Sequence, residues 1–253
     1  MRGARFAIAL TVGVLGLVAS AQAQETVQIT EAGFSPNVPG MPTNAFGNAT
    51  IGSTTLPVPS PITHVNVYGP AGVTLDLTGS TTCSASILER LGAKGCPANS
   101  KAGTGGGEGV YQIAQEFVKE KYTIGFYLTD NQPGHVAFAV LLTGNTPVAI
   151  EVVFTGSVIK GPSPYGLGFS LNVPLIKVLP EASDASAESA SLSLGAHGAT
   201  YYKKVHGKRR LEHIKGIILP KHCPRGGWPV ASQFSFQDGT SVMAKRTVPC
   251  PKG

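Results

Sequence analysis

The stretch YTIGFYLTDNQPGHVAFAVLL, residues 122–142, places two apolar segments on either side of a turn. Pro133 suits the second position of a tight turn, and Gly134 can adopt the positive φ that the third position of a type II turn requires. Two apolar runs separated by such a turn are typical of antiparallel strands. The stretch therefore predicts a β-hairpin in the middle of the chain.

Apolar and polar residues alternate elsewhere in the chain, as a half-buried strand requires. Residues 73–78 (VTLDLT) and 167–173 (LGFSLNV) alternate in this way, as do Phe234 and Phe236 with their polar neighbours. Residues 148–159 predict a longer, more buried strand. Glycine (32) and proline (19) are frequent and only 13% of residues are charged, which suits short strands and tight turns. We therefore expect an all-β fold, an antiparallel β-sandwich of one or two β subdomains.

One short helix is expected between two of the cysteines. Ser86 stands three residues before Glu89, which is the capping-box spacing, and Gly92 can end the helix in a left-handed conformation. The apolar residues expected to face the core are Ile87, Leu88 and Leu91.

Three regions carry weaker signals. Residues 24–60 contain five prolines and few large apolar side chains, so they predict an extended lead-in with room for one edge strand. Residues 110–118 fit either a strand or a helix. Residues 180–191 (PEASDASAESAS) predict a polar loop, near which the globular region, residues 61–253, would divide if it has two subdomains.

The first 23 residues have the pattern of a secretory signal peptide. Arg2 and Arg5 give a basic start, residues 6–18 carry no charge, and AQA at residues 21–23 is a small-residue cleavage site. This apolar run is shorter than the about 18 residues that a membrane span needs, and no later stretch reaches that length. We therefore predict cleavage after Ala23, a secreted extracellular chain and no transmembrane segment.

An oxidising compartment makes the four cysteines candidates for disulfides. Four cysteines allow three pairings, and we favour the two local ones, Cys83 with Cys96 around the helix and Cys223 with Cys250 around a hairpin. The turn of that hairpin is the Asp-Gly dipeptide at residues 238–239, a strong hairpin signal near the midpoint of its two cysteines. The chain has no C-x-x-C pair that would suggest redox chemistry.

The string CPANSKAGTG, residues 96–105, resembles a C-P-x-x-S-x-x-G-x-G motif of uncharacterised secreted, β-rich actinobacterial proteins. The C-terminal part resembles the tail of the same group, with CPRGGWP at residues 223–229, Asp-Gly at 238–239 and VPCP at 248–251. The resemblance covers about residues 60–253. It implies a secreted, disulfide-bonded β structure, and it brings no activity and no functional residues.

Charge is divided unevenly along the chain. Residues 24–200 hold 7 Lys and Arg against 12 Asp and Glu, whereas residues 201–253 hold 11 against 2. The excess is densest in YYKKVHGKRR, residues 201–210, where aromatic rings accompany five cations that could bind a polyanion. The candidate binding residues are Tyr201, Tyr202, Lys203, Lys204, Lys208, Arg209 and Arg210. Their expected partner is an anionic cell-surface polymer or polysaccharide and not an intracellular nucleic acid, and the alternative is a plain solvated loop.

Motifs for catalysis and for metal binding are weak. Residues 103–109 (GTGGGEG) lack the Lys-Ser/Thr end of a phosphate-binding loop and predict a glycine-rich edge strand or bulge. Four histidines within residues 197–222 lack zinc-site spacing, and Glu116 and Glu120 beside two lysines predict a solvated edge. Trp228 is expected to pack over the disulfide of Cys223. We therefore expect no cofactor and no metal.

These observations favour a non-catalytic binding or structural protein, secreted or associated with the cell envelope, whose contact surface is residues 201–215. The alternative is an extracellular hydrolase that acts on cell-wall or polymer substrates. Neither G-x-S-x-G nor H-E-x-x-H occurs. A Ser-His-Asp cluster assembled only in the fold stays open from composition alone.

Overall fold

The computed structural model describes residues 24–132, 134–195 and 198–251, so the predicted signal peptide lies outside the described residues. In this part of the chain, thirteen strands form one antiparallel sheet and two more form a separate ribbon. The elements are β1 (Glu25–Ser35), β2 (Pro42–Ser53), β3 (Ile62–Pro70), β4 (Thr74–Asp76), α1 (Ala85–Leu91), η1 (Gly92–Gly95), η2 (Ala98–Ser100), β5 (Lys101–Ile113), β6 (Glu116–Gln132), β7 (His135–Thr146), β8 (Ile150–Lys160), β9 (Tyr165–Asn172), β10 (Ser186–Leu194), β11 (Thr200–Val205), β12 (Lys208–His213), β13 (Gly216–Ile218), β14 (Trp228–Phe236) and β15 (Ser241–Val248).

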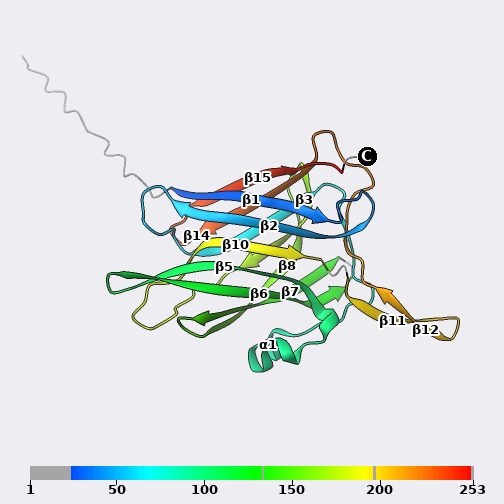
Figure 1. The fold of residues 1–253 in the computed structure, drawn as a ribbon, viewed down its shortest axis with the longest axis horizontal. Helices are drawn as coiled ribbons and strands as arrows, with labels where there is room; N and C mark the ends of the chain where they lie inside the picture. The colour runs from blue at the N-terminus through cyan, green and yellow to red at the C-terminus, as the bar shows by residue number, and fades with distance from the viewer. Residues whose placement is uncertain (1–23, 133, 196–197, 252–253) are drawn as a thin grey trace, which may run out of the picture.

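The large sheet folds over into two layers. Its strands follow the order β15-β14-β3-β9-β8-β7-β6-β5-β10-β2-β13-β4, and β1 also pairs with β2. The layer of β1, β2, β3, β10, β14 and β15 lies above β5, β6 and β7 in Figure 1. Strand β15, at one end of this order, also lies beside β1, where Arg246 of β15 donates a hydrogen bond to the backbone oxygen of Ile29 at 2.8 Å. The prediction of an all-β antiparallel sandwich with one short helix clipped by a disulfide is confirmed.

The core between the layers is aromatic in its middle and at one end. Phe126, Phe138 and Phe169, from β6, β7 and β9, pack edge to face with ring centroids 6.0 to 6.2 Å apart. At one end Trp228 is fully buried in a cluster that includes Cys223, as the sequence predicted. Its Nε1 donates a hydrogen bond to an asparagine side chain, which satisfies the buried indole N–H.

Both predicted hairpins and both predicted disulfides are present. The hairpin of β6 and β7 turns at residues 132–135, where Gly134 has φ 78°. The hairpin of β14 and β15 turns at residues 238–239, where Gly239 has φ 86°. Cys83 is bonded to Cys96 and Cys223 to Cys250.

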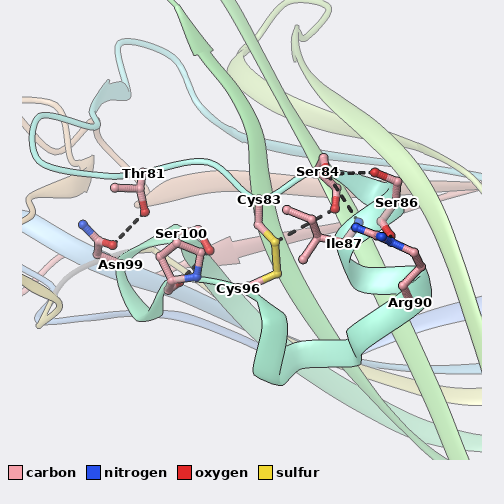
Figure 2. The surroundings of a disulfide bond; sticks show 10 residues. Thr81, Cys83, Ser84, Ser86, Ile87, Arg90, Cys96, Asn99 and Ser100 are labelled. Carbon is pink, nitrogen blue, oxygen red and sulfur yellow. Dashed lines mark hydrogen bonds between the residues drawn. A yellow bond between two sulfur atoms is a disulfide. The ribbon is translucent and has the colours of Figure 1, made fainter.

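Helix α1 lies on the outer face of the sheet, beneath β6 and β7 in Figure 1. The residue that caps it is Ser84 and not Ser86, since the Ser84 side chain accepts a hydrogen bond from the backbone N–H of Ile87 (Figure 2). Leu88 is fully buried, as predicted, but Leu91 is 60% exposed, so its assignment to the core was wrong. Ile87 is half-buried and packs against the same cluster as Leu88, as predicted.

Three regions with weak signals are strands or strand ends. Residues 24–60 hold the long hairpin of β1 and β2, where we expected an extended lead-in with room for one edge strand. Residues 180–191, expected as a loop, contain the first part of β10, which pairs with β2 and β5. Residues 110–118 are the turn between β5 and β6 with its flanking strand ends. The loop prediction for residues 180–191 was wrong because alanine and serine occur in sheets as well as in loops.

The glycine-rich strand β5, predicted as an edge strand or a bulge, is an internal strand between β6 and β10. A Cβ at Gly103 or Gly105 would lie against the backbone oxygens of Ser193 and Ser191 in β10. Ser100 of the same motif is fully buried and donates its hydroxyl to the backbone oxygen of Pro97 at 2.6 Å. The C-P-x-x-S-x-x-G-x-G motif therefore has structural roles at its cysteine, serine and glycines.

Candidate functional site

The seven predicted binding residues come together in one projecting feature. Strands β11 and β12 form a two-stranded ribbon, here called the cationic ribbon, which extends away from the sandwich (Figure 1). Its turn is His206-Gly207, with φ values of 48° and 80°. Positive φ at both central residues is the geometry that two-residue hairpin turns favour.

The register of the ribbon places like charges directly opposite one another. Lys203 faces Arg210 across the ribbon, and Lys204 faces Arg209. Because side chains alternate along a strand, one pair lies on each face. Like charges in directly opposed positions destabilise a strand pair. Both pairs are exposed, and none of these cations makes an ion pair with a residue that the structure describes.

The two tyrosines of the ribbon have different surroundings. Tyr202 is 64% exposed, and the guanidinium carbon of Arg209 lies 4.6 Å from the centroid of its ring, which is a cation–π contact. The ring of Tyr201 instead covers Gly79 in the body of the protein and is half-buried. Tyr202 can therefore contact a ligand together with Arg209, whereas Tyr201 attaches the ribbon to the body.

The base of the ribbon is held firmly. Ile214 is fully buried, and its backbone N–H donates to Ala199 at 2.8 Å. Lys215 donates from Nζ to Oδ2 of Asp76 at 2.9 Å. This hydrogen bond is the main reason that the pKa of Asp76 is lowered and that of Lys215 is raised. Lys215 is thus engaged at the base, and the free charge of the predicted surface 201–215 lies at residues 203–210.

Known proteins do not supply a function for this arrangement. The chain matches no protein-family model, no curated protein and no solved structure.

Metal-ligating residues do not gather within the described ranges, where no three His, Cys, Asp or Glu side chains could hold a metal ion together. His206, His213 and His222 are exposed, as predicted for solvated side chains. His197 lies outside the described residues.

One hydrogen-bonded series resembles part of a catalytic triad. The hydroxyl of Ser170 lies 3.0 Å from Nε2 of His64, and Nδ1 of His64 lies 2.9 Å from Oδ1 of Asn172. The third member is an amide and not a carboxylate, so it cannot stabilise an imidazolium by charge. Oδ1 of Asn66 also lies 3.1 Å from the same Nε2. All four residues lie on β3 and β9 within the sheet, where backbone pairing on both sides of β9 engages the N–H groups that an oxyanion would need.

The predicted solvated carboxylate Glu120 is in fact buried, with 3% of its surface exposed. Its two carboxylate oxygens accept hydrogen bonds from the backbone N–H groups of Thr146 and Val148, at 2.9 and 3.2 Å. These partners lie more than 25 residues further along the chain, so the local sequence around Glu120 gave no signal of them. The neighbouring Glu116 is exposed, as expected.

A cavity of about 370 Å³ lies between the two layers, and it was not predicted from the sequence. Its walls come from the inner faces of strands throughout the chain, and Tyr111, Glu120 and Ser232 are among the few polar residues that line it. No contiguous motif encodes such a cavity. The only signal of the cavity in the sequence is the frequency of alanine and glycine in strands whose inward positions would otherwise carry large apolar residues.

Proposed function

We propose that this protein is a secreted or envelope-associated, non-catalytic binding protein whose cationic ribbon binds an anionic polymer, such as an acidic polysaccharide. The observation that carries the proposal is the pair of directly opposed cations on each face of the ribbon. A chain of regularly spaced negative charges would neutralise both repulsions, and Tyr202 with Arg209 offers a flat surface for a sugar ring.

The surroundings of the ribbon support this role. Its base is fixed to the body through Ile214 and the ion pair of Lys215 with Asp76, so the cations are presented at a fixed position. Two disulfides suit an oxidising compartment. In the portion of the chain that the structure covers, no helix combines the length and apolarity needed to cross a bilayer.

Binding of the purified protein to polygalacturonate, measured over a series of salt concentrations, tests the proposal. Replacing Lys203, Lys204, Lys208, Arg209 and Arg210 together with serine should weaken binding at least about tenfold and flatten its salt dependence. The matched control removes the same charge from five exposed cations elsewhere. These control residues are Lys94, Lys160, Lys221, Arg225 and Lys245.

The control variant should keep most of its affinity. Equal losses in the two variants would show that net charge and not the ribbon is responsible, which would overturn the proposal. The ribbon variant should also unfold at the same temperature as the unmodified protein or at a slightly higher one, because the opposed cations destabilise the ribbon.

An extracellular hydrolase is the second candidate, and the contact of Ser170 with His64 is the observation that favours it. The amide third member and the flat position within the sheet make it the weaker candidate. We expect no turnover of p-nitrophenyl acetate above that of the Ser170→Ala variant. A rate that is lost specifically in Ser170→Ala would reverse this ranking.

A further inference from the structure

The cavity between the two layers has the size and character of a site for an apolar ligand. Its volume of about 370 Å³ falls within the about 300–1,000 Å³ of typical small-molecule sites. It is more than twice the about 150 Å³ of an engineered apolar cavity that binds benzene. Residues from both layers line it, including Val65, Val67, Ile124, Leu171 and Ala190.

Small side chains on particular strands leave this space. Protein interiors are close-packed, and voids of this size are few. Ala49 of β2 and Ala190 of β10 are cross-strand partners, and both line the cavity. Large apolar residues at these positions would fill the interior and add stability, so the small residues indicate that the space itself is used.

Two buried hydroxyl groups at the cavity have no partner among the described residues. Tyr111 is 1% exposed and Ser232 is 8% exposed, and both line the cavity. Neither the phenolic oxygen of Tyr111 nor Oγ of Ser232 makes a hydrogen bond within the described structure. A buried polar group without a partner is costly and calls for an explanation. A polar group of a bound ligand would supply one.

The charge beside Tyr111 limits what that ligand can be. Gly109 pairs with Glu120 and Tyr111 with Val118, which makes Tyr111 and Glu120 diagonal neighbours on one face of β5 and β6. Burial raises the pKa of Tyr111, and the charge of Glu120 raises it further, so the phenol stays a hydrogen-bond donor. A ligand carboxylate at this place would be repelled by Glu120, whereas an uncharged acceptor would not.

We propose that the cavity binds one lipid-like molecule with an elongated apolar body and an uncharged end group, and that Tyr111 donates a hydrogen bond to this end group. A fatty alcohol or a fatty ester has this chemistry, and an ionised fatty acid does not. This site is separate from the cationic ribbon, so the protein would bind an apolar ligand inside and an anionic polymer outside.

Binding of 1-dodecanol and of dodecanoate to the purified protein, measured by calorimetry and native mass spectrometry at neutral pH, tests the inference. We expect one molecule of 1-dodecanol per chain and at least about tenfold weaker binding of dodecanoate. Tyr111→Phe should lower the affinity for 1-dodecanol about fivefold without lowering the melting temperature of the ligand-free protein.

A cavity-filling variant sharpens the test. Ala190→Phe should abolish binding of 1-dodecanol, while Thr50→Phe, at an exposed position of β2, should leave it intact. If Ala190→Phe does not fold, the affinity of Tyr111→Phe for 1-dodecanol, compared with that of the unmodified protein, still tests the inference. Absence of 1-dodecanol binding, equal binding of dodecanoate, or an unchanged affinity in Tyr111→Phe would each overturn the inference, and none of these results bears on the ribbon.

Discussion

Strand β7 of the sandwich and strand β11 of the cationic ribbon have the same antiparallel pairing but opposite surroundings. Residues 138–141 of β7 are all buried, because the other layer covers one face and α1 covers the other. No residue of β11 is fully buried, and only Tyr201 and Val205 are half-buried. Stability therefore resides in the sandwich, while the ribbon can hold charges that would be costly inside it. This contrast makes the proposed binding by the ribbon separable from folding.

The largest expected effect lies in the aromatic core. Phe169→Ala removes the ring that packs against both Phe126 and Phe138, and it should lower the free energy of unfolding by about 3–5 kcal/mol. Tyr202→Ala in the ribbon should change it by less than about 0.5 kcal/mol, because the ring is exposed. Urea unfolding curves of the two variants measure both values. Similar losses would show that the ribbon and the sandwich fold as one energetic unit.

The sequence predicted elements whose signals are local. The hairpins at residues 132–135 and 238–239 follow from turn dipeptides, and both disulfides follow from cysteines that bracket short elements. The seven residues of the ribbon were found because charge density can be read along a chain. Their opposed register could not be anticipated until His206-Gly207 was known to form the turn.

What the sequence did not reveal depends on partners far along the chain. Strand β2 carries alanine and glycine, and it is a strand because β1 and β10 pair with it on either side. Glu120 is buried because backbone donors at Thr146 and Val148 reach its carboxylate. The cavity exists because the small residues Ala49 of β2 and Ala190 of β10 do not fill the space between the layers. None of these features produces an alternation of apolar and polar residues along a single strand, which is the pattern that predicts strands from sequence.

The smallest expected effects concern two acids, Glu25 in the sandwich and Asp76 at the base of the ribbon. Their contributions to stability should depend on pH in opposite directions. Burial raises the pKa of Glu25 above its ordinary 4.5. The folded state then holds a proton that the unfolded chain has released, and stability falls as pH rises from 4.5 through the raised pKa. Glu25→Gln should therefore be more stable than the unmodified protein at neutral pH, with the difference vanishing below about pH 4.

Asp76 should show the reverse. Lys215 and Thr78 lower its pKa below the ordinary 3.8, so its ionised form contributes stability that is present above pH 3.8 and is lost as pH falls through the lowered pKa. Asp76→Asn should be slightly less stable at neutral pH, and the difference should close in acid. Solvent screens this partly exposed pair, so the effect should be smaller than that of Glu25. Thermal unfolding of Glu25→Gln and Asp76→Asn at neutral and acidic pH measures both effects. If the two variants changed stability at neutral pH in the same direction, the two pKa shifts would be contradicted, because burial and ion pairing move a carboxyl pKa in opposite directions.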